Sequence, residues 1–315
     1  MDRTGAATAS LEVNLGGVRL KNPVTVASGT FGYGREYESF VDLSRLGAVA
    51  VKGLTLEPRA GNPPPRVVET PAGMLNAIGL ENVGIERYLG EKLPYLRQFE
   101  VPIIANISGF SIEEYTALAD RLCEARGADL IEVNVSCPNV RHGGMAFGAD
   151  PRMLEQITRA AVERSTLPVI VKLSPNVTDI AAMARIVEQS GAAAVSLVNT
   201  FLAMVIDVET RRPVLGNVTG GLSGPAIRPV AVRMVRDVFG AVSIPIVGMG
   251  GIMTARDALE FIIAGASAVA VGTANFVNPS AAIEVLEGIE DYCRRHQIED
   301  LRNLVGSLVI EGEHR

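Results

Sequence analysis

Eight short apolar runs recur along this 315-residue chain, and each ends in small or polar residues. The runs are apolar throughout rather than alternating, which is typical of parallel strands buried on both faces. Helix-start signals lie between them, so strand and helix are expected to alternate. The runs are Val24–Ser28, Ala48–Lys52, Pro102–Asn106, Asp129–Asn134, Pro168–Leu173, Ala194–Asn199, Ile244–Gly248 and Ala268–Gly272, and the signals are Ser111 with Glu114, Asp150 with Pro151, Thr254 with Asp257, and Asn278 with Pro279.

Eight strand–helix units in about 250 residues predict an α/β fold, a (β/α)8 TIM barrel, because a doubly wound sheet usually has fewer strands. We expect one domain over residues 1–315, with a flexible N-terminus at 1–10 and a flexible tail at 306–315. Leu11–Pro23 alternates about two glycines and predicts a hairpin that closes the N-terminal end of the barrel. Gly53–Val101 far exceeds ordinary loop length, which predicts a functional loop over the C-terminal mouth.

Charge and cysteine usage restrict the partners and the compartment. The net charge is −6 and no lysine or arginine run is present, which argues against nucleic-acid or membrane partners and leaves small molecules and proteins. Three separated cysteines form no CxxC pair, so neither a zinc site nor an iron–sulfur cluster has its usual ligand spacing. A cytoplasmic location is expected, because Met1–Ser10 lacks the apolar core of a secretory signal.

The residues at which the apolar runs stop are unusually polar. Barrel enzymes place their chemistry at the C-terminal ends of the strands, so these side chains are expected to meet at one mouth. An asparagine after a strand is often only a turn or cap residue, but the joint occurrence of lysines and asparagines favours a ligand site. The strand ends supply Ser28, Lys52, Gly53, Asn106, Asn134, Cys137, Lys172, Asn199, Thr200, Gly250, Gly251, Gly272 and Thr273.

Lysines and glycines at the strand ends predict an anionic ligand. A lysine that ends an apolar strand loses hydration, and an anion restores the balance. The sequences GMGGI (248–252) and GTANF (272–276) follow the seventh and eighth runs, where barrels often bind phosphate through glycine backbone N–H groups. Glycine turns also serve ordinary connections, but the combination indicates flavin mononucleotide (FMN).

Cys137 differs from the other two cysteines in its position. Cys123 and Cys293 lie on expected helices and are interpreted as packing residues. Cys137 lies just beyond the fourth run and before Pro138, at the expected mouth. A free thiol has a pKa of about 8.5, so this residue is able to act either as a base or as a nucleophile. His142 nearby is interpreted as a solvated loop residue and is left out of the site.

The sequence contains, in this order, the segments ASGTFGYG (27–34), NAIGLEN (76–82), NVSCPNVRHGGMAFG (134–148), NTFLAMVID (199–207), ETRRPVLGNVTGGLSG (209–224), TGGLSGPAI (219–227) and GMGGI (248–252). Together these segments closely resemble the catalytic subunit of class 1 dihydroorotate dehydrogenases, subtype B. The resemblance covers nearly the whole chain. A cysteine base separates class 1 from class 2, which uses serine, and the third and fifth segments resemble subtype B rather than the fumarate-using subtype A.

The resemblance implies that Cys137 removes the C5 proton of (S)-dihydroorotate while hydride passes from C6 to FMN, which gives orotate in de novo pyrimidine (UMP) biosynthesis. Dihydroorotate is a carboxylate with amide edges, which asparagines and a lysine suit. The glycines after Pro138 predict a lid. The resemblance assigns substrate binding to Lys52, Asn76, Ala77, Ile78, Gly79, Leu80, Asn134, Asn199 and Thr200, and FMN binding to Ser28, Lys52, Gly53, Asn106, Asn134, Lys172, Val198, Gly224, Gly250, Gly251, Gly272 and Thr273.

The same resemblance implies that electrons leave FMN through a 2Fe-2S cluster and FAD to NAD. This sequence has neither cluster-ligand spacing nor a GxGxxG fingerprint, so the resemblance implies a separate electron-transfer subunit, in a heterotetramer of two catalytic and two electron-transfer chains. A homodimer of catalytic chains is also expected. The alternatives are a subtype A-like enzyme reoxidised by fumarate, an inosine-monophosphate-dehydrogenase-like barrel with a nucleophilic Cys137, and a non-enzymatic ligand-binding barrel.

Overall fold

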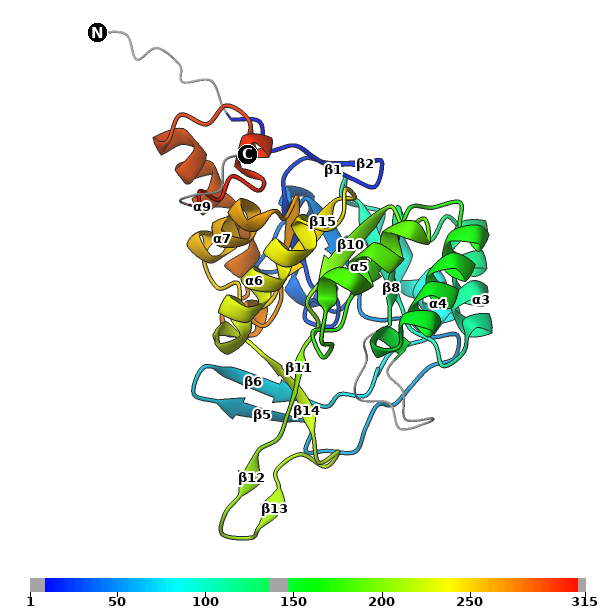
Figure 1. The fold of residues 1–315 in the computed structure, drawn as a ribbon. Coiled ribbons are helices and arrows are strands. Elements are labelled where there is room, and N and C mark those ends of the chain that lie inside the picture. The colour runs from blue at the N-terminus through cyan, green and yellow to red at the C-terminus, as the bar shows by residue number, and fades with distance from the viewer. Residues whose placement is uncertain (1–8, 136–146, 311–315) are drawn as a thin grey trace, which may run out of the picture.

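The computed structural model describes residues 9–135 and 147–310. Eight parallel strands close into a barrel in the order β10-β15-β16-β3-β4-β7-β8-β9, which confirms the predicted fold (Figure 1). Each strand begins and ends within two residues of its predicted run. The strands are β3 (Val24–Val26), β4 (Ala48–Ala50), β7 (Ile103–Ile107), β8 (Leu130–Asn134), β9 (Val169–Lys172), β10 (Ala194–Leu197), β15 (Ile246–Met249) and β16 (Ala268–Val271).

Helices surround the barrel (Figure 1). Each of the six longer helices buries an apolar face. The predicted caps form at three helices: Ser111 accepts a hydrogen bond from the Glu114 N–H, Asp150 accepts from the first turn of its helix, and Thr254 forms a capping box with Asp257. The longer helices are α3 (Ile112–Glu124), α4 (Pro151–Arg164), α5 (Ile180–Gln189), α6 (Arg228–Phe239), α7 (Ala255–Ala264) and α9 (Ala281–Arg295), and the short ones are α1 (Ile85–Arg87), α2 (Leu93–Leu96) and α8 (Ala274–Val277).

The helix start predicted at Asn278 and Pro279 is wrong by two residues. Helix α9 has Ser280 as its N-cap, and the Asn278 side chain accepts a hydrogen bond from the Ser280 N–H at 3.0 Å. Asn278 therefore closes the turn between α8 and α9 instead of capping the longer helix.

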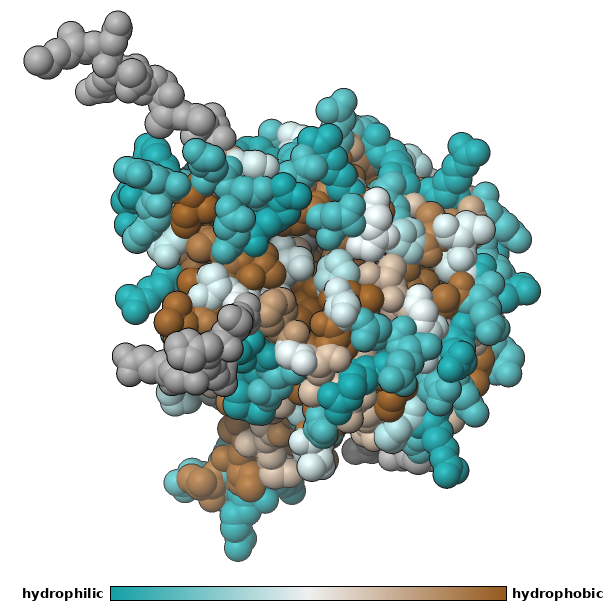
Figure 2. All heavy atoms as spheres, turned by 45° about the horizontal axis from the view of Figure 1, so that its top comes forward, coloured by the Kyte–Doolittle hydropathy of each residue, from teal (hydrophilic) through white to brown (hydrophobic). Residues whose placement is uncertain are grey.

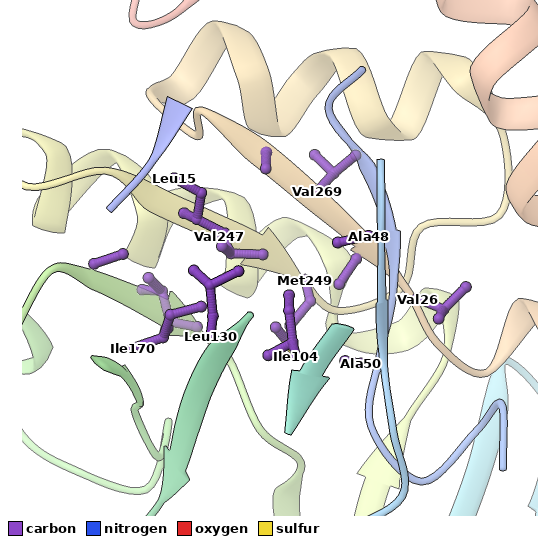
Figure 3. Close-up of a cluster of buried hydrophobic side chains, with 14 of the residues drawn as sticks. Leu15, Val26, Ala48, Ala50, Ile104, Leu130, Ile170, Val247, Met249 and Val269 are labelled. Atoms are coloured by element: carbon purple, nitrogen blue, oxygen red, sulfur yellow. The ribbon is translucent and has the colours of Figure 1, made fainter. Parts of the chain in front are cut away.

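The predicted N-terminal hairpin closes the N-terminal end of the barrel. It consists of β1 (Val13–Leu15) and β2 (Val18–Leu20), which pair antiparallel. Leu15 is fully buried and lies close to Leu130, Ile170 and Val247 of the barrel strands (Figure 3). A Cβ at the neighbouring Gly16 would lie 2.8 Å from the Cβ of Ala193, just before β10. The hairpin thus seals the end of the barrel opposite the strand C-termini.

A second, four-stranded sheet lies beyond the C-terminal ends of the barrel strands (Figure 1). Its order is β11-β14-β6-β5, and the antiparallel ribbon β12–β13 extends from it. Two of its strands come from the long connection after β4, which the sequence predicted only as a loop. The strands are β5 (Val67–Thr70), β6 (Gly73–Asn76), β11 (Phe201–Ala203) and β14 (Gly220–Ser223), and the ribbon joins β12 (Ile206–Asp207) to β13 (Arg212–Pro213).

Both ends of the described chain are attached to the barrel by backbone hydrogen bonds. Ser10 donates to the Glu299 carbonyl at 2.8 Å, and Gly306 donates to the Ile262 carbonyl at 3.0 Å. Of the segments 1–10 and 306–315 that were expected to be flexible, residues 1–8 and 311–315 lie outside the described residues. Within the described ranges, every helix is too short or too polar to cross a membrane.

Candidate active site

A cavity of about 490 Å³ opens at the C-terminal mouth of the barrel, beneath the four-stranded sheet. This size is within the range of small-molecule and cofactor sites. The wall comes from strand ends that are far apart in the sequence, as predicted from the polar residues that follow each run. The predicted site residues that line the cavity are Ser28, Lys52, Gly53, Asn76, Ile78, Gly79, Leu80, Asn106, Asn134, Lys172, Val198, Asn199, Thr200, Gly250, Gly251, Gly272 and Thr273.

The segment from Asn76 to Leu80 is held over the cavity by side chains of the long connection. The Asn62 side chain donates to the Ala77 carbonyl at 2.9 Å, and the Asn82 side chain donates to the Leu80 carbonyl at 2.7 Å. Asn76 ends β6 and is in register with Gly221 of β14. The segment therefore forms a fixed roof, with its position set by the sheet and by two buttressing amides.

Two asparagines face each other where β8 and β10 end. The Asn199 side chain donates to the Asn134 Oδ1 at 3.4 Å, and its own Oδ1 accepts from the Thr200 N–H at 2.8 Å. The Tyr115 hydroxyl of α3 donates to the Asn134 carbonyl at 2.8 Å. These contacts hold both amides in defined orientations, so they present fixed donors and acceptors to a ligand.

Two lysines contribute positive charge to the cavity wall. Lys52 follows β4 and is half-buried, whereas Lys172 ends β9 and is 5% exposed. The Lys172 Nζ lies 3.9 Å from a carboxylate oxygen of Glu132, which is also buried. A buried cation that keeps one face toward a cavity favours an anionic or strongly polar ligand there.

An unused hydrogen-bond acceptor is buried beside the cavity. The Asn106 Oδ1 has no partner among the described residues, and neither has the Ser108 Oγ. A Cβ at Gly53, which lines the cavity, would lie 3.0 Å from that Asn106 oxygen. Because buried polar groups normally have a partner, the arrangement suits a ligand with an N–H group.

Glycines at the ends of β15 and β16 allow close approach to the backbone. Gly251 has φ +79°, and a Cβ there would lie 2.7 Å from the Gly224 carbonyl oxygen. The Cβ of a residue replacing Gly272 would meet only Ala27, at 3.4 Å. The Thr273 hydroxyl beside it donates to Ser223 at 2.8 Å. Backbone N–H groups with this freedom and a neighbouring hydroxyl can bind phosphate oxygens.

Some predicted residues do not line this cavity. Ala77 is fully buried with Leu75 and Leu215, in a small cluster on the face of the four-stranded sheet that is turned away from the cavity, because Met74 and Asn76 on either side of Leu75 line the cavity. Gly224 lies behind the wall, where a Cβ would be 2.7 Å from the Cα of Gly73. Cys137, with its predicted lid and His142, lies outside the described residues.

The other two cysteines are remote from the cavity wall. Cys293 is buried in α9, and burial raises the pKa of its thiol, as a packing role requires. Cys123 packs partly against the core. Burial raises the pKa of Cys123, but hydrogen bonds from Thr166 and Ser165 outweigh burial and lower the pKa overall.

Sequence reasoning missed several residues of the site. Apolar or small residues that line the cavity, such as Met74, Ile227 and Phe276, carry no local signal of a ligand. Glu132 is different, because a carboxylate inside the apolar run Asp129–Asn134 is itself a signal of a buried polar contact.

Comparison with known proteins gives consistent matches over nearly the whole chain. The family model described as dihydroorotate dehydrogenase matches residues 10–293. The protein named dihydroorotate dehydrogenase B (NAD(+)), catalytic subunit, from Desulforamulus reducens is 58% identical over 95% of this chain and 98% of its own length. Its namesake from Geotalea daltonii is 54% identical over 96% of this chain and 100% of its own length.

A solved structure supports the same fold. The crystal structure of DHODH from Eimeria tenella in complex with ferulenol matches with a TM-score of 0.79 at 23% identity, over 97% of this chain and 90% of that chain. With the barrel, the cavity and the full-length matches taken together, this chain belongs to the dihydroorotate dehydrogenase family.

Proposed function

We propose that this chain oxidises (S)-dihydroorotate to orotate, a step of de novo pyrimidine (UMP) biosynthesis, with FMN as its cofactor. One observation carries the proposal: lysines, asparagines and glycines from the barrel's strand ends surround a common cavity. Relatives at 54% and 58% identity have names that specify this activity. Because a barrel fold alone does not fix function, the proposal depends on these residues.

The cavity wall suits FMN, and we propose one FMN-binding domain over residues 1–315. The backbone N–H groups of the glycines after β15 and β16 would donate hydrogen bonds to the phosphate, and the Asn106 Oδ1 would accept a hydrogen bond from a ring N–H. When bound, FMN supplies the hydride acceptor for the substrate's C6. The residues proposed to hold it are Ser28, Lys52, Gly53, Asn106, Asn134, Lys172, Val198, Gly224, Gly250, Gly251, Gly272 and Thr273.

Dihydroorotate would bind beneath the roof segment. Its carboxylate suits Lys52, and its amide edges suit side chains such as Asn134 and Asn199, which offer both donors and acceptors. The roof would also limit the access of water to the reacting atoms. The residues proposed to contact substrate are Lys52, Asn76, Ile78, Gly79, Leu80, Asn134, Asn199 and Thr200, and Ala77 would hold the roof segment in place from its buried position.

We propose Cys137 as the base that takes the proton from C5. It follows Asn134 by three residues in the sequence, and Asn134 is at the cavity wall. A thiol with an ordinary pKa of about 8.5 becomes an effective base near neutral pH if nearby cations lower its pKa modestly.

An electron-transfer partner would complete the reaction. The relatives are named as catalytic subunits of an NAD(+) enzyme, which favours NAD over fumarate as the final oxidant. We propose that a second subunit carries FAD and a 2Fe-2S cluster, in an assembly of two chains of each kind. A cytoplasmic location, which keeps thiols reduced, fits this chemistry.

A homodimer of this chain would account for an exposed apolar row. Leu202, Met204, Ile206 and Val208 alternate along β11 and the ribbon, and each is 45–77% exposed. Hydrophobic side chains gather on the protrusion at the lower left of Figure 2. Ala203 and Val205 between them pack inward against a small buried cluster, so the row has a defined outward face.

The spectrum of the purified chain tests the proposed activity. We expect flavin absorption bands that bleach when dihydroorotate is added without oxygen, with one orotate formed for each FMN reduced. A colourless, folded chain with no affinity for added FMN would refute the proposal. That outcome would favour an inosine-monophosphate-dehydrogenase-like barrel, in which the cysteine acts as a nucleophile without flavin.

Replacing the proposed base should slow the chemistry without removing FMN. Serine has a much higher pKa than cysteine, so Cys137→Ser should slow flavin reduction about 10²–10⁴-fold at pH 7, with recovery as pH rises. Stopped-flow reduction across pH measures this effect, with Cys123→Ser as the matched control. An unchanged rate in the Cys137 variant would mean that another residue is the base.

A charge in the apolar row should break the homodimer. Sedimentation should give a dimer mass for the unaltered chain and a monomer mass for Ile206→Asp, because the interface would bury an unpaired carboxylate. Phe40→Asp is the matched control, since Phe40 is similarly exposed at 58% but lies far from the row in the sequence. A dimer that survives Ile206→Asp would place the interface elsewhere.

A further inference from the structure

Glu132 is a charged residue inside the barrel with no direct part in the cavity wall. It lies in the middle of β8, is 4% exposed, and precedes Asn134 by two residues on the same strand. It therefore lies one layer deeper than Asn134, and it is in register with Asn106, which reaches the cavity. A carboxylate is costly to bury in this position unless it is fully hydrogen-bonded and paired with a cation.

Its contacts cross four adjacent strands of the barrel. One carboxylate oxygen accepts a hydrogen bond from the Asn106 Nδ2 of β7 at 2.6 Å and lies 3.9 Å from the Lys172 Nζ of β9. The other oxygen accepts from the Ser196 hydroxyl of β10 at 2.7 Å. Asn106 and Ser196 are fully buried, so water does not compete for these contacts.

The carboxylate decides which way the Asn106 amide faces. An ionised carboxylate only accepts hydrogen bonds, so the amide must turn its NH₂ group toward Glu132. Its oxygen then faces away, and this Oδ1, which has no partner within the part of the chain that the structure describes, lies beside Gly53 at the cavity. Glu132 thus converts an ambiguous amide into a fixed acceptor.

The same carboxylate offsets the charge of Lys172, which lines the cavity and whose ammonium lies 3.9 Å from Glu132. An uncompensated cation there would favour any ligand state that carries more negative charge. Reduced flavin carries more negative charge than oxidised flavin when its N1 is deprotonated.

We propose that Glu132 is a positioning residue that orients Asn106 and offsets Lys172, and thereby sets the relative affinity of the site for oxidised and reduced FMN. This inference rests on the proposed FMN site. Glu132→Gln removes the negative charge and frees the Asn106 amide to turn, because glutamine can donate as well as accept. Loss of the charge disfavours oxidised FMN relative to reduced FMN, whereas loss of the fixed Asn106 acceptor weakens the binding of both states, because the ring N–H that it would accept from is present in both.

The test measures the affinities of the apoprotein for oxidised and reduced FMN and the midpoint potential of the bound flavin. Relative to the unaltered chain, Glu132→Gln should shift the affinity ratio at least tenfold toward reduced FMN. This shift corresponds to a rise of about 30 mV in the midpoint potential of the bound flavin, for a two-electron couple. Ser196→Ala is the matched control, since it removes a hydrogen bond to Glu132 but no charge, and it should change the ratio less than threefold. A purely structural role would lower stability in both variants and leave both ratios unchanged.

The outcomes separate this inference from the proposed function. An unaltered chain that binds no FMN refutes the proposed function. If the unaltered chain binds FMN, and Glu132→Gln has a ratio of affinities for reduced and oxidised FMN within threefold of the unaltered chain, only the role of Glu132 is overturned. If Glu132→Gln does not fold, Glu132→Asp is the deciding variant, because it keeps the charge but withdraws it from Asn106. FMN should then bind at least fivefold more weakly than to the unaltered chain, while the ratio of the affinities for reduced and oxidised FMN stays within threefold of the unaltered chain. Unchanged FMN binding by Glu132→Asp would overturn the inference.

Discussion

Closure of the parallel barrel is the constraint on which the rest of the structure depends. Each of the eight strands is hydrogen-bonded on both sides, so the barrel has no free edge at which a ligand could pair. Apolar side chains fill the interior from the N-terminal end of the strands, and they include Leu15 of the hairpin (Figure 3). Polar groups can therefore meet a ligand only at the ring of strand C-termini, and this is where the cavity lies.

Polarity inside the barrel rises in steps toward that cavity. Apolar residues such as Ile104 and Leu130 form the lowest layer, and two residues further along the same strands are Asn106 and Glu132. Period-two alternation within a strand produces this stacking, because residues two apart face the same side. The middle layer is fully buried yet charged, and it can be stable only because its members satisfy one another. Asn106 of this layer lines the cavity itself, and Glu132 orients it.

Local sequence patterns predicted the barrel well and the four-stranded sheet poorly. Continuous apolar runs and cap residues such as Ser111 and Thr254 are signals carried by a few neighbouring residues, and the structure confirms them. The four-stranded sheet pairs Asn76 with Gly221, residues far apart in the sequence whose pairing no local pattern specifies. Glu132 carries a local signal, as a carboxylate inside an apolar run, but its partners Asn106 and Ser196 come from other strands, and no local pattern identifies them.

The central claim is that the glycines after β15 and β16 form a phosphate site at one end of a flavin cavity. Equilibrium binding of FMN and of riboflavin to the apoprotein tests it most directly, because the two ligands differ only in the phosphate. We predict that FMN binds at least tenfold more tightly, about 1.4 kcal/mol, and that salt weakens this advantage. Equal affinities for FMN and riboflavin would contradict the account.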